Sequence, residues 1–250
     1  MNIPDIAARG FGSASDAYER GRPSYPPEAV TFLGGVLGFG PASTVVDVAA
    51  GTGKLTRSLI PEAGTVLAVE PVAAMRAVLA ELVPLARPVA GAAEALPLAT
   101  GSVDAVVVAQ AFHWFRVAEA LAEAARVLRP GGGLAMLWND RDETVPWVAR
   151  LSELVRWHDR PVPGYHSVDW VAAVAADGGF EPLQRRQFRL DQELDVSTLV
   201  DRVLSTSYVA AWPEHRRQQL AGEVADLVAD QPERFILPYR TDVFWCRRRP

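Results

Sequence analysis

Short apolar runs alternate with stretches of helical spacing through the middle of the chain. Runs such as residues 65–69 and 103–109 are brief and bounded by glycine, proline or polar residues, which is typical of strands buried in a parallel sheet. The pattern predicts strands over residues 44–49, 65–69, 88–91, 103–109 and 133–138, and helices over residues 28–37, 54–60, 72–82 and 117–128. Because strand and helix alternate, we expect an open, mostly parallel α/β sheet.

The second half of the chain follows a different pattern. Apolar positions from Val148 to Val155 are spaced as on a helix, and residues 168–176, 195–212 and 214–229 also favour helices. Residues 188–190 are expected to be the end of a strand, and a last strand is expected over residues 235–247. We therefore expect one domain over residues 1–250, divided into leader helices (1–42), a sheet core (43–140), a mainly helical insertion (141–232) and a final strand (233–250).

Composition limits the chemistry that this chain can perform. Its single cysteine is Cys246, its single lysine is Lys54, and its four histidines are not clustered. A lone cysteine forms neither an intrachain disulfide nor a cysteine-cluster metal site, and no histidine pair has the HExxH spacing. We therefore expect no metal, and Schiff-base chemistry would have to use Lys54.

Charge and hydropathy bear on partners and location. The net charge of −5 argues against a basic nucleic-acid surface. Residues 1–9 lack the apolar stretch of a secretory signal, and the longest apolar runs are too short to cross a bilayer. We expect a cytoplasmic monomer or homodimer with no nucleic-acid and no membrane partner.

A glycine-rich turn, Asp47 to Gly53 (DVAAGTG), follows the first predicted strand and leads into a predicted helix. In open α/β sheets, ligands bind beyond the carboxyl ends of the strands. Glycine lets a ligand approach the backbone, and the start of a helix offers free N–H groups. The turn is therefore a candidate binding site.

Three ligands compete for this turn, and two of them match it poorly. A dinucleotide fingerprint needs a third glycine where Thr56 stands. A phosphate loop matches Gly53 and Lys54, but it needs glycine where Val48 stands and serine or threonine where Leu55 stands.

The third ligand is indicated by a resemblance. The spacing Asp47-x-Ala49-x-Gly51-x-Gly53 resembles the first motif of the class I S-adenosylmethionine (SAM)-dependent methyltransferases, with Ala49 in place of the first glycine. Segments that resemble the later motifs of this family, in order, are residues 92–98 on the adenine side, 109–115 facing the methionine half and the methyl group, and 128–133 as a structural turn.

The two ends of the chain resemble a narrower group. Phe11-Gly12, Tyr18, Arg20 and Arg22 to Pro26, together with residues 237–243, are similar to the leader and tail of small-molecule methyltransferases such as trans-aconitate methyltransferase. The resemblance implies a Rossmann-like, mostly parallel seven-stranded sheet. Helices would cover both faces, a helical insertion would precede the last strand, and that strand would be antiparallel.

The cofactor site follows from the turn and from the resemblance. Glu70 ends the second predicted strand, where a carboxylate is placed to accept hydrogen bonds from both ribose hydroxyls. The resemblance places the methionine portion on the turn and on the backbone carbonyl of Gln110, the adenine on Ala93 and Glu94, and Tyr18 and Arg22 over the cofactor unless they merely anchor the leader. The expected cofactor-binding residues are Tyr18, Arg22, Asp47, Ala49, Ala50, Gly51, Gly53, Glu70, Pro71, Ala93, Glu94 and Gln110.

We expect methyl transfer from SAM to a small-molecule acceptor, for example an O-methylation, largely by proximity and positioning, with S-adenosylhomocysteine (SAH) as product. A general base is needed only if the acceptor must lose a proton, and His113 is the candidate unless it simply packs. Arg141 is a candidate for binding an anionic acceptor. The candidate acceptor-site residues, several of which have core packing as the alternative, are Trp114, Trp138, Asn139, Arg141 and Tyr208.

Other functions stay open at this point. A non-catalytic SAM-binding sensor would keep the same cofactor motifs. A methyltransferase acting on RNA or protein would need a basic stripe beside the pocket, and a nicotinamide oxidoreductase would bind NADH.

Overall fold

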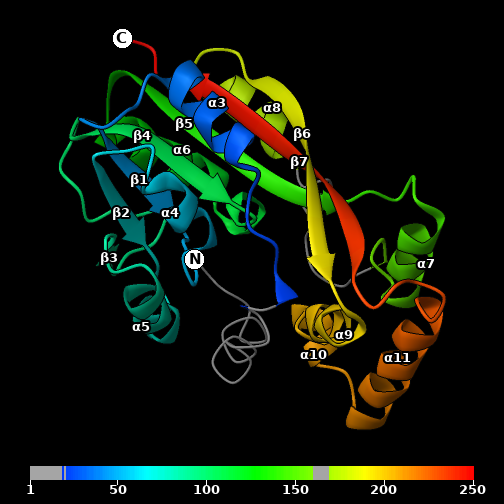
Figure 1. Cartoon of the computed structure of the whole chain (residues 1–250). Helices are drawn as coiled ribbons and strands as arrows, with labels where there is room; N and C mark the ends of the chain where they lie inside the picture. The colour runs from blue at the N-terminus through cyan, green and yellow to red at the C-terminus, as the bar shows by residue number, and fades with distance from the viewer. Residues whose placement is uncertain (1–18, 20, 160–168) are drawn as a thin grey trace.

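The computed structural model describes residue 19, residues 21–159 and residues 169–250. Its centre is a seven-stranded sheet with the strand order β3-β2-β1-β4-β5-β7-β6 (Figure 1). Strands β1 to β5 are parallel, and β7 is antiparallel to both β5 and β6. The strands are β1 (Thr44–Val48), β2 (Thr65–Val69), β3 (Arg87–Val89), β4 (Val103–Ala109), β5 (Leu128–Arg141), β6 (Gln184–Leu194) and β7 (Phe235–Arg247). The expected mostly parallel sheet with an antiparallel last strand is confirmed.

Helices cover both faces of the sheet. The helices of the described residues are α3 (Pro27–Leu37), α4 (Lys54–Leu59), α5 (Ala73–Leu82), α6 (Val117–Val127), α7 (Pro146–Leu154), α8 (Trp170–Asp177), α9 (Val196–Leu204), α10 (Ser207–Ala210) and α11 (Glu214–Leu227), with a 3₁₀ turn η1 (Phe112–Trp114). None of the described helices is both long and apolar enough to cross a membrane.

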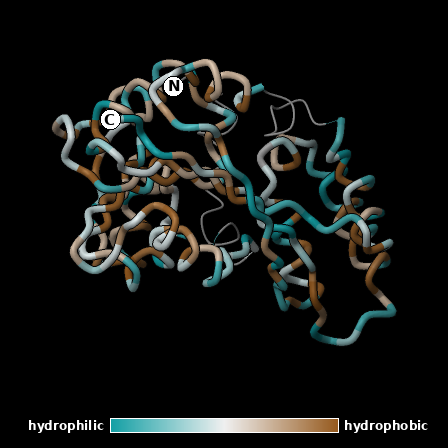
Figure 2. The backbone as a smooth tube through the Cα atoms, turned by 90° about the horizontal axis from the view of Figure 1, so that it is seen from above, coloured by the Kyte–Doolittle hydropathy of each residue, from teal (hydrophilic) through white to brown (hydrophobic). Residues whose placement is uncertain are grey.

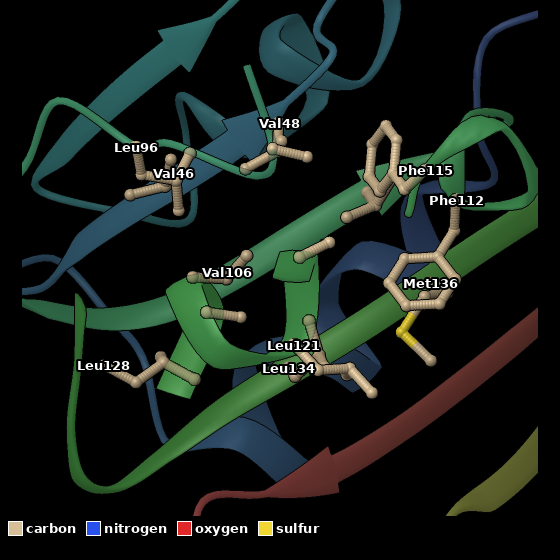
Figure 3. Packing of buried hydrophobic residues seen from close by; sticks show 14 of the residues in the cluster. Val46, Val48, Leu96, Val106, Phe112, Phe115, Leu121, Leu128, Leu134 and Met136 are labelled. Carbon is tan, nitrogen blue, oxygen red and sulfur yellow. The ribbon is translucent and has the colours of Figure 1, made fainter. Parts of the chain in front are cut away.

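Alternate side chains of the central strands enter two separate cores because successive residues of a strand point to opposite faces. Val46 and Val48 pack with Leu121 of α6 in the core shown in Figure 3. Val45 and Val107 pack on the other face with α3 and α4. Burying a leucine as fully as Leu121 contributes about 2 kcal/mol.

Beyond the ends of β5, β6 and β7, helices α7, α9, α10 and α11 form a helical cap (Figure 1). A third core joins these helices to the strands through residues such as Leu151, Leu199, Leu220 and Leu237. The cap forms a separate lobe that the strands connect to the rest of the molecule (Figure 2). The expected helical insertion before the last strand is confirmed, because α9 to α11 lie between β6 and β7.

Three local expectations were wrong or incomplete. Residues 188–190 were expected to end a strand, whereas β6 spans eleven residues and continues to Leu194. It is an edge strand whose first four residues are all polar and exposed, so the apolar alternation begins only at Phe188. The segment 128–133, expected as a turn, forms the beginning of β5, where the register against β4 shifts. The helix expected over residues 195–212 is divided into α9 and α10.

Candidate functional site

The carboxyl ends of β1 and β4 lie side by side at the point where the strand order reverses. Strand β1 pairs with β2 on one side and with β4 on the other. This is the position at which open α/β sheets bind ligands. A cleft opens here between the sheet, the leader segment and helix α9. Its lining residues are Arg22, Pro23, Tyr25, Asp47, Ala49, Ala50, Gly51, Thr52, Lys54, Leu55, Ala109, Gln110, Asn139, Arg202 and Tyr239.

The turn after β1 adopts left-handed backbone at three positions. The φ angles are 57° at Ala49, 59° at Gly51 and 88° at Gly53. A Cβ on Gly51 would meet nothing within 4 Å, whereas one on Gly53 would lie 2.8 Å from Cγ2 of Val83. Gly51 therefore leaves open space at the cleft, while Gly53 allows close packing against the end of α5. Gly53 does not line the cleft.

Asp47 places a carboxyl group at the floor of the cleft with only 1% of its surface exposed. Thr56 donates its hydroxyl hydrogen to Oδ2 at 2.6 Å, but Oδ1 has no hydrogen-bond partner among the described residues. Burial raises the pKa of Asp47 to about 7; the Thr56 hydrogen bond opposes the rise and the charge of Glu70 adds to it. An unpaired buried acceptor is costly, so this oxygen is suited to a ligand that donates a hydrogen bond.

Glu70 connects the end of β2 to the same turn. Its two carboxylate oxygens accept hydrogen bonds from the backbone N–H groups of Gly51, at 3.0 Å, and Val72, at 2.8 Å. Burial raises the pKa of Glu70. Each carboxylate oxygen keeps a second lone pair, so Glu70 retains capacity to accept from a ligand, although it is 4% exposed and does not line the cleft.

A charged cluster joins the leader to α4. Glu19 pairs with Arg57 and, at 3.1 Å, with Lys54, and it accepts a hydrogen bond from the Thr52 hydroxyl at 2.7 Å. Burial opposes ionisation of Glu19, but the Thr52 hydrogen bond and the charge of Lys54 outweigh it and lower the pKa. Burial also lowers the pKa of Lys54. These contacts fix the leader beside the glycine-rich turn.

Gln110 and Asn139 form the part of the cleft at the ends of β4 and β5. Gln110 has a left-handed φ of 59°, and its side-chain amide donates to the carbonyl of Asn139 at 3.1 Å. The Asn139 side chain donates to the carbonyl of Ser24 at 2.8 Å and accepts from the Thr241 hydroxyl at 2.7 Å. Asn139 therefore connects the leader to β7.

The adenine-side residues lie away from this cleft. Ala93 is buried in the core, and Glu94 accepts a hydrogen bond from the backbone N–H of Arg116 at 3.0 Å, just before α6. Pro71 follows Glu70 and does not line the cleft either. Tyr18 lies outside the described residues. The structure thus brings together Arg22, Asp47, Ala49, Ala50, Gly51, Gln110 and Asn139 from the predicted site.

Trp138 and His113 form a hydrogen-bonded pair. Nε1 of Trp138 donates to Nδ1 of His113 at 3.2 Å. With Nδ1 accepting, a neutral imidazole carries its proton on Nε2, so action of His113 as a base would require this bond to break. Trp138 is 1% exposed and packs on Trp170 and Phe244. Trp138 is therefore placed by core packing, and Trp114 packs against the same core.

The predicted acceptor residues Tyr208 and Arg141 are both buried in the cap region. Tyr208 donates its hydroxyl hydrogen to the Val155 carbonyl at 2.8 Å within the cap core and does not line the cleft. Arg141 is 3% exposed, and its guanidinium lies over the ring of Trp157.

Eight of the residues that line the cleft were not predicted as site residues. Six of them are neighbours in sequence of predicted ones, whereas Arg202 and Tyr239 come from α9 and β7. Arg202 shares the buried face of α9 with Leu199 and Val203. A charged residue at an apolar position of that helix was the available signal. Tyr239 lies in β7 opposite Arg141, and only the strand register shows this.

Metal and thiol chemistry find little support in the described part of the chain. It contains no group of three or more His, Cys, Asp or Glu side chains that could hold a metal ion. Burial raises the pKa of the Cys246 thiol to about 12, with Glu181 and Asp177 adding to the rise. Because the thiolate is the nucleophile, Cys246 is unreactive at neutral pH.

Comparison with known proteins points to one family. Residues 46–136 match the methyltransferase domain family. The chain is 42% identical over 236 residues, covering 92% of both chains, to an uncharacterized methyltransferase of Mycobacterium tuberculosis. It is 34% identical over 197 residues, 76% of this chain and 67% of the relative, to the malonyl-[acyl-carrier protein] O-methyltransferase of Methylococcus capsulatus. A provisionally assigned type II methyltransferase of Anaeromyxobacter dehalogenans superposes with a TM-score of 0.67 at 26% identity, covering 90% of this chain and 96% of that one.

Proposed function

We propose, from the premise that this chain belongs to the class I SAM-dependent methyltransferases, that it binds SAM in the cleft at the carboxyl ends of β1 and β4 and methylates a small-molecule acceptor. The observation that carries the proposal is the buried Oδ1 of Asp47, which has no partner among the described residues, in a cleft that Asp47 lines together with the open position at Gly51. A ligand with hydrogen-bond donors and an extended backbone contact fits this arrangement.

Asp47, Ala50 and Gly51 would hold the methionine portion of the cofactor, with Ala49 shaping the turn, Arg22 closing over it and the Gln110 carbonyl meeting the amino group. Glu70 would use its remaining lone pairs for the ribose. Ala93, Glu94 and Pro71 would form the adenine side, and Tyr18 stays a prediction outside the described residues. When bound, SAM supplies a sulfonium methyl group whose C–S bond breaks as the acceptor attacks, with the electron pair leaving on sulfur as SAH.

The chain's own contribution is positioning. A backbone hydrogen bond joins the turn to Glu70, and contacts with Lys54 and Asn139 hold Glu19 and Ser24 beside it, so the chain's own contacts position much of the cleft wall. Preorganisation of this kind accelerates a displacement without a reactive side chain. A base is needed only for an acceptor that must lose a proton, and His113 is then the candidate once the Trp138 contact opens.

We further propose that the acceptor is a metabolite and that its methylation is an O-methylation. Arg202 of cap helix α9 and Tyr239 of β7 contribute to the wall of the cleft, which suits a small molecule, and the net charge of −5 disfavours a nucleic-acid acceptor. The similarity to an O-methyltransferase supports oxygen as the methylated atom. We regard the cap as part of one cytoplasmic domain, because β7 pairs with both β5 and β6.

The cofactor proposal is tested by titrating SAH into the purified chain and into two variants, Asp47→Ala and Gly51→Val. Both variants should lose binding while keeping a folded circular dichroism spectrum. Matched controls are Asp230→Ala and Gly222→Val, which change exposed positions away from the cleft and should bind normally. Normal binding by Asp47→Ala and Gly51→Val would place the site elsewhere.

Activity is tested by incubating the protein with methyl-labelled SAM and a metabolite extract. Labelled small molecules support the proposal. SAH binding without labelled product across broad extracts would favour a sensor, and label in RNA or protein would favour a macromolecular acceptor. NADH that displaces SAH would indicate an oxidoreductase.

A further inference from the structure

Two arginines and a tyrosine meet where the cap joins the sheet. Arg141 is the last residue of β5, Tyr239 lies directly opposite it in β7, and Arg202 comes from α9. Their exposed fractions are 3%, 1% and 4%. Arg202 and Tyr239 line the same cleft as Asp47. Arg202 and Tyr239 therefore belong to the wall of the cleft on the cap side, and Arg141 adjoins them as the strand partner of Tyr239 without lining the cleft itself.

The polar atoms of this cluster have few partners. Nε, Nη1 and Nη2 of Arg141, Nε and Nη1 of Arg202, and the Tyr239 hydroxyl are all buried without a hydrogen-bond partner among the described residues. Neither arginine forms an ion pair within the described part of the chain. The charge of Arg202 adds to burial in lowering the pKa of Arg141, which indicates that the two cations face each other's field.

Two buried guanidinium groups without an ion pair among the described residues are costly, because each charge has lost its hydration, and the nearby Asp140 and tyrosine side chains offset only part of the effect of burial on the Arg141 pKa. The Trp157 ring under Arg141 offers partial compensation only. Guanidinium groups recognise carboxylates and phosphates through paired, charge-assisted N–H···O bonds, and a tyrosine hydroxyl adds a neutral donor. The missing partner is therefore an oxyanion.

The location separates this cluster from the turn proposed to bind the cofactor. Arg141 lies four residues beyond Leu137, which pairs with the last residue of β4, so it is about 13 Å past the end of β4. Tyr239 lies on β7, three strands and about 14 Å across the sheet from β1. A ligand group at the cluster would come from a molecule on the cap side of the cleft.

We propose that Arg141, Arg202 and the Tyr239 hydroxyl bind an oxyanion, a carboxylate or a phosphate, carried by the methyl acceptor. The inference rests on the proposed function, since it assigns the acceptor to the cap side of a cofactor-loaded cleft. It makes these three residues determinants of substrate specificity: acceptors without an anionic group would leave two buried cations unpaired and would be rejected.

The test uses the full chain saturated with SAH and measures calorimetric binding of two probes, citrate and inorganic phosphate, against chloride at equal ionic strength. The wild-type chain should bind at least one probe. Arg141→Met and Arg202→Met should each weaken that binding at least tenfold, and Tyr239→Phe about threefold. Arg150→Met, on the exposed face of cap helix α7, is the matched control and should leave it unchanged.

SAH affinity, measured in parallel, should be the same in all of these variants. Equal probe binding by the wild-type chain and the arginine variants, or no probe binding by the wild-type chain, would overturn the proposal. So would loss of SAH affinity in Arg141→Met or Arg202→Met, because the arginines would then serve a carboxylate of the cofactor. If the wild-type chain failed to bind SAH, the proposed function would fail. Titration of the ligand-free chain with the two probes would still test whether the cluster binds an oxyanion. Tyr239→Phe removes one oxygen only and keeps the test decisive if an arginine variant does not fold.

Discussion

Asp47→Asn tests the physical basis of the site, because it removes a buried charge while keeping the shape of the side chain. The carboxyl group has its pKa raised from 3.8 to about 7, mainly by burial. Below pH 3.8 it is protonated in both the folded and the unfolded chain. As the pH rises, the unfolded chain ionises first, and the free energy of unfolding falls until the folded pKa is passed. A rise from 3.8 to about 7 corresponds to a total loss of about 4 kcal/mol.

Part of this loss falls within an accessible range, since about 3 kcal/mol of it should occur between pH 5 and pH 8. The assay is urea unfolding of the ligand-free wild-type and Asp47→Asn chains across that range. The Asn side chain still accepts from Thr56, so the variant should stay folded and lack this part of the pH dependence. The difference between the two chains cancels the titration of all other groups.

The control is Asp230→Asn, which changes an exposed carboxylate after α11 and should reproduce the wild-type curve. Parallel pH dependences for the wild-type and Asp47→Asn chains would refute the reasoning, because Asp47 would then ionise alike in both states. Such a result would also remove the buried, unsatisfied carboxyl group as an argument for a ligand.

Gly53→Ala should lower the free energy of unfolding by about 2–3 kcal/mol, since its Cβ would lie 2.8 Å from Val83 at a φ of 88°. Gly51→Ala should lower it by only about 1 kcal/mol but weaken SAH binding at least tenfold, and urea unfolding with calorimetry separates the two effects. Arg202→Met should raise the free energy of unfolding of the ligand-free chain by about 1–4 kcal/mol, because it removes an unpaired buried cation, and urea unfolding should show a higher midpoint. A lower midpoint would mean that the charge of Arg202 is compensated. His113→Gln should lower the methyl-transfer rate less than tenfold and keep its pH profile, whereas a loss above a hundredfold with an altered profile would make His113 the base.

Local patterns were enough to predict the sheet core. The bounds expected for β2 and β4 agree with the structure because each is an apolar run ended by a polar residue or a turn within a few positions. The glycine-rich turn also depends on neighbours in sequence, and its left-handed positions fall within Asp47 to Gly53. The edge strand β6 was only partly predicted, since its first four residues are polar and exposed and the alternation that burial imposes begins only at Phe188.

The sequence by itself thus determined the strand–helix alternation, the binding turn and the resemblance to a methyltransferase. All three depend on the spacing of residues that are close together in the chain. Only the tertiary structure decided which aromatic and charged side chains meet the cleft. The side chains of Trp138 and Tyr208 are packed in hydrophobic cores, whereas Arg202 and Tyr239 line the cleft next to Arg141. These three residues lie far apart in the chain and meet through the antiparallel register of β5 with β7 and the return of α9. Long-range pairing of that kind leaves no periodic trace in the sequence.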